Sequence, residues 1–130
     1  MLVDLAQRPD SRAFPKLVQP PHVGHCSAVK NSILLTGTKV PHFNYVGDSI
    51  IGSSCNLGAG TKIANLRNDR APVRVCGRST GRVKFGAISG DGVSCGINGS
   101  VNAGSVVGGN PRGAPQSDIH GCIMEGTEMR

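Results

Sequence analysis

The side chains that could bind a metal ion or form disulfides are the four histidines and the five cysteines. His25 and His42 are 17 residues apart, but no third histidine lies close to His42, and zinc sites use three or four protein ligands. The cysteine count is odd, and the sequence contains no Cys-x-x-Cys pair. We therefore expect no metal site, no disulfide framework and a reducing, cytoplasmic location. The cysteines are Cys26, Cys55, Cys76, Cys95 and Cys122.

Basic side chains give a second chemical signal, because 14 Lys and Arg against eight Asp and Glu leave a formal net charge of +6. Such a charge favours anionic partners. Most of it lies in residues 65–86, where a Val-Arg-Val and a Val-Lys-Phe stretch flank a segment rich in Gly, Ser and Thr. This alternation predicts a protruding β-hairpin loop. The cations of the loop are Arg67, Arg70, Arg74, Arg78, Arg82 and Lys84, and Asp69 is its one acid.

Nucleic acid and membranes are two anionic partners that the sequence argues against. Only Phe85 lies near the basic loop to stack on bases, so we expect no nucleic acid, and a solvated charged loop explains the same run. No apolar run reaches the ~20 residues that cross a bilayer. Asp4 lies near the N-terminus with no basic segment before an apolar stretch, which argues against a signal peptide.

The composition points to an all-β fold. The 130 residues include 19 glycines and eight prolines, which disfavour helix interiors. Only three Phe and one Tyr are present, with no Trp, so a core built around large rings is excluded. Because 38% of the residues are hydrophobic, many of them β-branched, we expect an ordered β structure and not a disordered chain.

A six-residue period organises the middle of the chain. Aliphatic or small side chains recur every six residues, followed by Gly, Asn or Ala, and by a small residue at the fourth position. Each hexapeptide reads as a short strand plus a corner, with the aliphatic side chain pointing to the axis of a triangular prism. Three hexapeptides close a coil of 18 residues. The inward positions include Ile51, Leu57, Ile63, Ser89, Cys95, Val101 and Val107.

The period sets the expected organisation of the chain. We expect a lead-in over residues 1–21, a β-helix over 22–109 interrupted by the loop at 65–86, and an irregular tail over 110–130. Cys95 falls on an inward position, and Cys55 and Cys26 fall on small fourth positions, so all three read as packing residues. Ser89 would place a hydroxyl on the axis, where it needs a hydrogen-bond partner.

The run from Pro41 to Gly52, PHFNYVGDSIIG, carries the most specific motif, and NLGAGT follows at residues 56–61. The pattern His-x-x-Tyr-x-Gly-Asp, then Asn-x-Gly-Ala-Gly-Thr, with a later Lys-Phe and Gly-Asp, resembles the acetyltransferase domain of the bifunctional enzyme that acetylates and uridylylates glucosamine-1-phosphate. It resembles still more closely the C-terminal domain of archaeal-type sugar-1-phosphate nucleotidylyltransferases. The likeness covers roughly residues 23–108. It implies a left-handed parallel β-helix, a homotrimer, and acetyl-CoA bound between neighbouring subunits.

The same resemblance implies a role for particular residues. His42 matches the family's general base, which suits an imidazole that must take a proton from an amino sugar near neutral pH. Asp48 or a backbone carbonyl could orient its ring. The expected function is acetyl transfer from acetyl-CoA to the amine of a hexosamine-1-phosphate. The resemblance assigns Tyr45, Asn56 and Asn65 to the sugar, Lys84 and Arg74 to its phosphate, and the backbone of Ala59 to acetyl-CoA.

Other interpretations of these residues remain open. His42 could be an ordinary surface histidine, Asn56 and Asn65 could be corner residues with positive φ, and Tyr45 could pack at a subunit seam. The family's nucleotidyltransferase domain is not found in the sequence, so we expect no nucleotidyl transfer. Coils that complete the acetyl-CoA site in relatives are not recognisable after Gly109. A non-catalytic trimeric β-helix module without a complete CoA site is therefore the alternative function.

Overall fold

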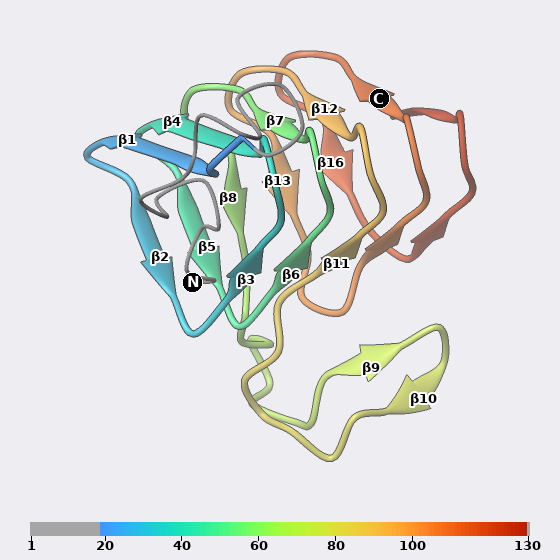
Figure 1. Cartoon of the computed structure of the whole chain (residues 1–130). Coiled ribbons are helices and arrows are strands. Elements are labelled where there is room, and N and C mark those ends of the chain that lie inside the picture. Colours follow the sequence, from blue (N-terminus) through green and yellow to red (C-terminus); the bar gives the residue numbers. More distant parts are fainter. Residues whose placement is uncertain (1–18, 130) are drawn as a thin grey trace.

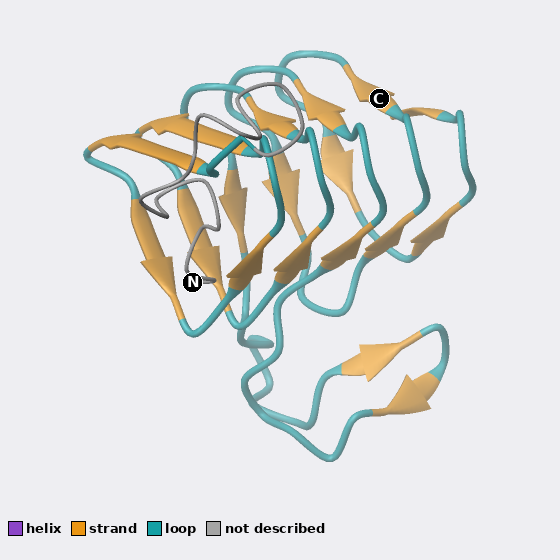
Figure 2. Cartoon of the chain, in the orientation of Figure 1, coloured by secondary structure: helices purple, strands orange, loops and turns teal. Residues whose placement is uncertain are grey.

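A computed structural model describes residues 19–129, which form a parallel β-solenoid of about six turns, consistent with a left-handed β-helix (Figure 1). Three sheets form the sides of the prism, and each takes one short strand from successive coils. None of the described residues forms a helix (Figure 2). The all-β, parallel β-helix prediction is confirmed. The predicted lead-in lies almost wholly outside the described residues.

The three sheets contain the following strands, in spatial order. Sheet A contains β1 (His22–His25), β4 (Lys39–His42), β7 (Asn56–Leu57), β12 (Ser94–Cys95), β15 (Arg112–Gly113) and β18 (Glu128–Met129). Sheet B contains β2 (Ala28–Lys30), β5 (Tyr45–Gly47), β8 (Lys62–Ile63), β13 (Ser100–Val101) and β16 (Asp118–Ile119). Sheet C contains β3 (Ile33–Leu34), β6 (Ile50–Ile51), β11 (Ile88–Ser89), β14 (Val106–Val107) and β17 (Cys122–Ile123).

Aliphatic side chains at the predicted inward positions fill the axis of the prism. Val40, Val46, Ile51 and Ile63 are each at most 2% exposed. Coil length differs from the expected 18 residues in the first turns, because β1 pairs with β4 at a spacing of 17, Val23 opposite Val40. Eighteen-residue coils appear later, where β13 pairs with β16. Burying this column of aliphatic groups is the main source of stability, since no single coil encloses a core.

Two of the three predicted packing cysteines are buried. Cys55 and Cys95 lie in the core, and burial raises the pKa of the Cys95 thiol to about 11, with a smaller contribution from Cys55. The prediction for Cys26 is wrong: it is exposed and takes φ +55° at a corner. Ser89 finds the partner it needs, because its hydroxyl accepts a hydrogen bond of 3.0 Å from the Gly52 amide.

One corner of the prism repeats an unusual backbone conformation in five successive coils. The residues at this corner, which joins sheet A to sheet B, all have positive φ. Side chains other than Gly tolerate that region poorly, but each coil's corner is hydrogen-bonded to the next, as where the Gly60 amide donates to the His42 carbonyl at 3.0 Å. The stacked residues are Cys26, Phe43, Gly60, Asn98 and Gln116.

The basic loop protrudes from the corner between sheets B and C. Its strands β9 (Arg74–Val75) and β10 (Arg78–Ser79) are antiparallel, and Cys76 and Gly77 form a tight turn with φ of +46° and +82°. Positive φ at both central residues is typical of a type I′ turn, whose twist matches that of the flanking strands. An isolated bridge between Leu66 and Lys84 closes the base. A hairpin therefore forms within residues 65–86, as predicted.

The chain after Gly109 is not irregular, in contrast to the expectation for residues 110–130. Strands β15 to β18 continue the three sheets with parallel pairing up to Met129. The inward position of β15 is Gly113, and the Met129 methyl group lies 3.2 Å from where its Cβ would be. The long Met129 side chain thus fills the space that an aliphatic residue would occupy, and the period is hidden in the sequence.

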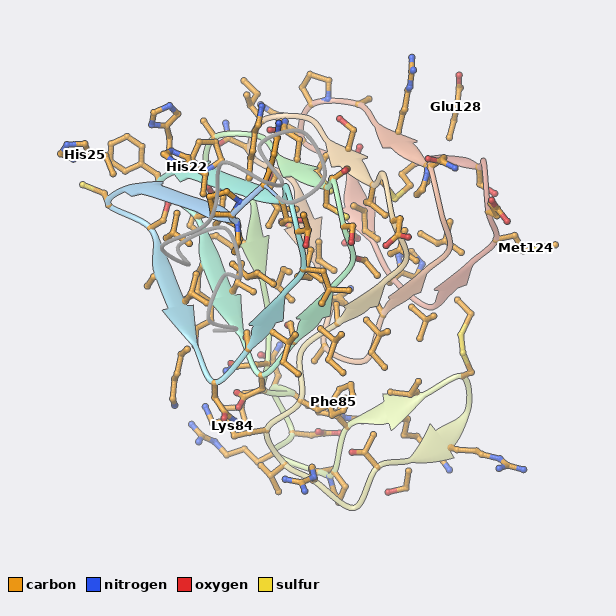
Figure 3. The ribbon with its side chains drawn as sticks, in the orientation of Figure 1. His22, His25, Lys84, Phe85, Met124 and Glu128 are labelled. Carbon is orange, nitrogen blue, oxygen red and sulfur yellow. A yellow bond between two sulfur atoms is a disulfide. The ribbon has the colours of Figure 1, made fainter. Side chains whose placement is uncertain are left out.

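A disulfide joins Cys76, at the tip of the hairpin, to Cys122 in β17 (Figure 3). The expectation that the five cysteines form no disulfide is therefore wrong for this pair. Disulfides are rare in most reducing cytosols, so the cytoplasmic location stays a prediction. In residues 19–129 no helix is long and apolar enough to cross a membrane.

Candidate functional site

Three polar side chains from successive coils form a hydrogen-bonded ladder at the corner between sheets B and C. Asn31, Asp48 and Asn65 are each 17 residues apart, one coil. Asn31 Nδ2 donates to Asp48 Oδ1 at 2.7 Å, and Asn65 Nδ2 donates to Asp48 Oδ2 at 2.6 Å. The carboxylate is held between an amide of the preceding coil and an amide of the next. We call these three residues the amide ladder.

Tyr45 joins the ladder from the other end of β5. Its phenol oxygen accepts a hydrogen bond of 3.1 Å from Asn65 Nδ2, although Tyr45 begins the strand and the ladder lies after it. The ring runs along the strand over Gly47, where a Cβ would lie 2.5 Å from Asn65 Nδ2 and 2.7 Å from the Tyr45 oxygen. Glycine at this position therefore leaves the space in which Tyr45 and Asn65 meet.

Asp48 is the electrostatic centre of the cluster. The hydrogen bond from Asn31 is the largest cause that lowers its pKa, partial burial opposes it, and Asn65, Lys30 and Lys84 lower it further. Asp48 is thus ionised over the physiological range. Figure 3 shows Lys84 at the base of the hairpin, next to the corner that joins β5 to β6. The charges of Lys30 and Lys84 thus act on a carboxylate whose oxygens already accept amide hydrogen bonds.

Asn65 is only 7% exposed, and its nitrogen donates to both Asp48 and Tyr45. These two bonds use both hydrogens of the amide and fix its orientation. The Oδ1 of Asn65 makes no side-chain hydrogen bond with any other described residue. Asn31 Oδ1 likewise accepts no hydrogen bond from the described residues, so the two amide oxygens of the ladder are both open acceptors.

His42 lies at a different corner, the one between sheets A and B. It ends β4, its side chain is exposed, and its Cα pairs with that of His25 in β1. Its backbone amide donates to Asn44 Oδ1 at 3.0 Å. Ala59 occupies the same corner one coil later, next to the Gly60 amide that donates to the His42 carbonyl. Asp48 uses its two oxygens in the amide ladder, so the expectation that it could orient His42 finds no support in these contacts.

The predicted site residues are therefore not gathered at one place in the chain. Tyr45, Asn65 and Lys84 meet at the B–C corner, and His42 and Ala59 share the A–B corner. Asn56 begins β7 on the outer face of sheet A, opposite Lys39 of the preceding coil. Arg74 lies in β9 of the hairpin.

Three residues of the cluster were missed in the sequence: Lys30, Asn31 and Gly47. The 17-residue spacing of Asn31, Asp48 and Asn65 was a usable signal, because residues one coil apart stack in a solenoid. It was hidden by the expectation of 18-residue coils. Among the described residues, no three His, Cys, Asp or Glu side chains gather closely enough to hold a metal ion. The absence of a metal in the working protein stays a prediction.

Comparison with known proteins identifies relatives of this chain. It is 48% identical over 103 residues to the bifunctional protein GlmU of Methanocaldococcus jannaschii, covering 76% of this chain and 25% of that protein. It is 48% identical over 97 residues to GlmU of Methanococcus vannielii, covering 72% and 23%. A bifunctional sugar-1-phosphate nucleotidylyltransferase/acetyltransferase of Sulfurisphaera tokodaii is 42% identical over 113 residues, covering 84% and 28%. No protein-family model matches the chain.

The chain spans about a quarter of the length of the curated relatives that it matches, and the matching part is their C-terminal part. The resemblance found in the motifs is confirmed by these relatives, and the solenoid agrees with it. The chain is thus a homologue of the C-terminal part of the bifunctional GlmU and sugar-1-phosphate nucleotidylyltransferase/acetyltransferase proteins.

Proposed function

We propose that this chain transfers an acetyl group from acetyl-CoA to the amine of a hexosamine-1-phosphate. The observation that carries the proposal is the cluster of Tyr45, Asp48 and Asn65, a polar site of fixed geometry with two lysines beside it. It occurs in a chain 42–48% identical to proteins named for acetyl transfer or as GlmU. A carboxylate, an oriented amide and a phenol can together select the hydroxyl and amine groups of a sugar.

His42 is the proposed general base. Its exposed imidazole takes the proton of the sugar amine as the nitrogen bonds to the acetyl carbon, while the carbon–sulfur bond breaks and CoA leaves as the thiolate. The proton held by His42 then passes to the sulfur, directly or through solvent, to give the thiol and the free base. Acetyl-CoA supplies the activated thioester when it is bound. Ala59, one coil beyond His42, holds it through its backbone in this proposal. The A–B corner continues past Ala59 to Ile97 and Pro115, so the coil after Gly109 extends the surface available to acetyl-CoA.

The phosphate of the sugar is proposed to lie between Lys30 and Lys84. Lys30 ends β2 just before Asn31, and Lys84 bridges Leu66, which follows Asn65. The charges of both lysines lower the pKa of Asp48. Asp48 alone would repel a phosphate, and two cations reverse the local charge. Lys84 was expected to bind the phosphate. We propose the same role for Lys30 because it lies at the end of β2, next to Asn31 of the ladder.

His42 and Lys84 lie at different corners, with strand β5 between them. Three strand residues alone span about 10 Å, so one sugar molecule is not expected to contact both groups of the same chain. The proposed site therefore joins the A–B corner of one copy to the B–C corner of its neighbour. Contacts between unlike surfaces close into a ring when the rotation allows it, which suits the proposed homotrimer.

Exposed apolar side chains support this pairing of corners. Phe43 and Ile97, 62% and 51% exposed, lie at the A–B corner. Ile33 and Ile50, 41% and 43% exposed, begin neighbouring strands of sheet C just after the B–C corner. In this proposal these apolar side chains, which lie beside the two halves of the site, are covered by the neighbouring copy.

The test is release of free thiol from acetyl-CoA with glucosamine-1-phosphate and galactosamine-1-phosphate as acceptors, for the wild type and His42→Ala. We expect turnover that needs an acceptor and falls at least ~100-fold in His42→Ala, while the oligomer stays intact. A well-folded oligomer that releases no thiol with either acceptor would favour the non-catalytic module.

A further inference from the structure

We propose that the disulfide between Cys76 and Cys122 is a redox-reactive site that exchanges with small anionic thiols and clamps the tip of the hairpin. Both cysteines are exposed, so a small thiol can reach either sulfur. The bond joins residues 46 apart in the sequence, one in the turn of the hairpin and one in the edge strand of sheet C (Figure 3). It therefore ties two parts of the fold that the backbone does not connect directly.

Around the disulfide, the tip of the hairpin is not packed against the solenoid. Residues 76–79 are all exposed. No described atom beyond its chain neighbours lies within 4 Å of where a Cβ of Gly77 would be, and Gly121, next to Cys122, has the same open surroundings. Because neither end of the bond is enclosed, opening it disturbs few other contacts and frees the tip to move.

The neck of the hairpin is held without the disulfide. Val73 is fully buried, and its amide donates to the Arg82 carbonyl at 2.8 Å. Thr80 closes the neck from the other strand, because its amide and its hydroxyl both donate to the Val73 carbonyl, at 2.9 and 2.7 Å. Reduction of the disulfide should therefore release residues 76–79 and leave the neck, and Lys84 at the base, in place.

The two sulfurs differ in the charges that surround them. Arg74 and Arg78 lie two residues on either side of Cys76, and no Asp or Glu occurs from residue 70 to residue 90. Neighbouring cations stabilise a thiolate, so Cys76 is the better leaving group of the pair. They also attract anionic reagents, which makes small anionic thiols the partners that this site favours. The titratable residues nearest Cys122 in the sequence are mostly acidic: Asp118, His120 and Glu125.

The exchange proceeds in two steps. A small thiolate attacks Sγ of Cys122, the bond between the two protein sulfurs breaks, and Cys76 leaves as its thiolate. A second small thiolate then attacks the small thiol's sulfur in the mixed disulfide, which releases the Cys122 thiolate and a small disulfide. The protein pair gains two electrons, two small thiols are oxidised, and their two protons pass through solvent to the cysteines. The reverse reaction with a small disulfide closes the clamp.

The first experiment is reduction of the native, oxidised chain by 2-mercaptoethanesulfonate and by cysteamine, which carry a sulfonate and an ammonium group. The two are compared at equal thiolate concentration, and the free thiols are blocked and located by mass spectrometry. We expect both to open the native disulfide, the sulfonate at least about threefold faster at low salt, with the difference lost in 1 M salt. The mixed disulfide should be trapped on Cys122.

Resistance of the native disulfide to both thiols until the chain is unfolded would overturn the proposal. Faster reduction by cysteamine at low salt would overturn the assignment of anionic thiols as partners. A mixed disulfide trapped only on Cys76 would contradict the order of the two steps, because Cys122 would then be the leaving group.

Limited digestion with trypsin tests the clamp. Arg78 lies in the tip and Arg82 in the neck, so initial cleavage after each is compared in the oxidised chain and in the reduced chain with its thiols blocked. We expect reduction to speed cleavage after Arg78 about tenfold and after Arg82 less than about twofold. Cys122→Ser should behave like the reduced chain without any reductant. Cys26→Ser, which removes an exposed thiol outside the pair, should match wild type.

Equal cleavage after Arg78 in the oxidised and reduced wild type would overturn the clamp, and this comparison does not need either variant to fold. Equal acceleration after Arg78 and Arg82 would also overturn it, because the whole hairpin would then be released. These outcomes do not depend on acetyl transfer, which His42→Ala tests separately.

Discussion

Asn65 Nδ2 lies 2.6 Å from Asp48 Oδ2 and 3.1 Å from the Tyr45 phenol oxygen, so one buried amide connects two coils and both ends of strand β5. A corner of a solenoid needs no such network, because backbone bonds already join the coils. The two hydrogen bonds of Nδ2 fix the orientation of the Asn65 amide. A change that breaks them should therefore destabilise this corner and also disturb the proposed sugar site.

Replacing Asp48 by Asn should destabilise the protein at neutral pH. The change removes a charged acceptor of two amide hydrogen bonds, which at a partly exposed site contributes about 1–2 kcal/mol to the free energy of unfolding. Denaturant unfolding of Asp48→Asn against wild type measures it. Asp118→Asn is the matched control, because Asp118 lies exposed on sheet B with no side-chain hydrogen bond among the described residues. Equal losses in the two variants would contradict a special role for the ladder.

The contribution of Asp48 should also depend on pH. Its pKa is lower in the folded state than the ordinary value, so the stabilisation is complete above the unfolded pKa of about 3.9 and is lost as the pH falls through the lower, folded value. The stability difference between wild type and Asp48→Asn should be constant from pH 5 to pH 7 and shrink below about pH 4. A stability difference that grows on acidification would show that folding raises, and does not lower, the pKa of Asp48.

Gly47→Ala should damage the site more than the fold. The added methyl would lie 2.5 Å from Asn65 Nδ2 and 2.7 Å from the Tyr45 oxygen, so both side chains must move. We expect a loss of about 1–3 kcal/mol and a higher KM for the sugar phosphate. Gly99→Ala is the control, since the nearest atoms to its Cβ would be at ordinary contact distances of 3.4 and 3.5 Å. Unchanged stability and KM in Gly47→Ala would contradict the packing described here.

The cysteines make a prediction that needs no activity. Cys26 is exposed, Cys55 and Cys95 are buried, and Cys76 and Cys122 are joined. Titration with an aromatic disulfide reagent should find about one thiol in the native chain, about three after denaturation and about five after reduction. Five thiols in the denatured, unreduced chain would contradict the disulfide. Fast reaction of Cys95 in the native chain would contradict its burial and raised pKa.

Much of the solenoid follows from its sequence, and the exceptions have physical reasons. Inward aliphatic positions repeat strictly in the central coils, so the prism and the position of the hairpin can be predicted. The last coils cannot, because Gly113 leaves an inward position to be filled by Met129 from the next coil. The disulfide was missed because Cys76 and Cys122 are 46 residues apart and meet only when the hairpin tip reaches β17.

The candidate site was harder to predict than the fold. The motif identifies the residue types, but it does not reveal that β5 separates His42 from Lys84. It also conceals the role of Asn31, which lies before the motif and belongs to the site only because coils of 17 residues stack it on Asp48. The distance between two corners depends on how many residues form each side of a coil. A single sequence reveals that number only through its repeat period.

Acetyl transfer by mixed oligomers tests the central claim most directly, that one site combines His42 of one copy with the Lys84 corner of another. His42→Ala and Lys84→Ala both change exposed side chains, so both chains should fold. They are co-assembled in equal amounts, and thiol release from acetyl-CoA is measured with a hexosamine-1-phosphate. We predict almost no turnover for each variant alone and recovery of about a quarter of wild-type turnover in the mixture. The fraction is about a quarter because an intact interface needs His42 in one copy and Lys84 in its neighbour, and each is present in about half of the copies. Mixed oligomers that form but recover no activity would contradict the account.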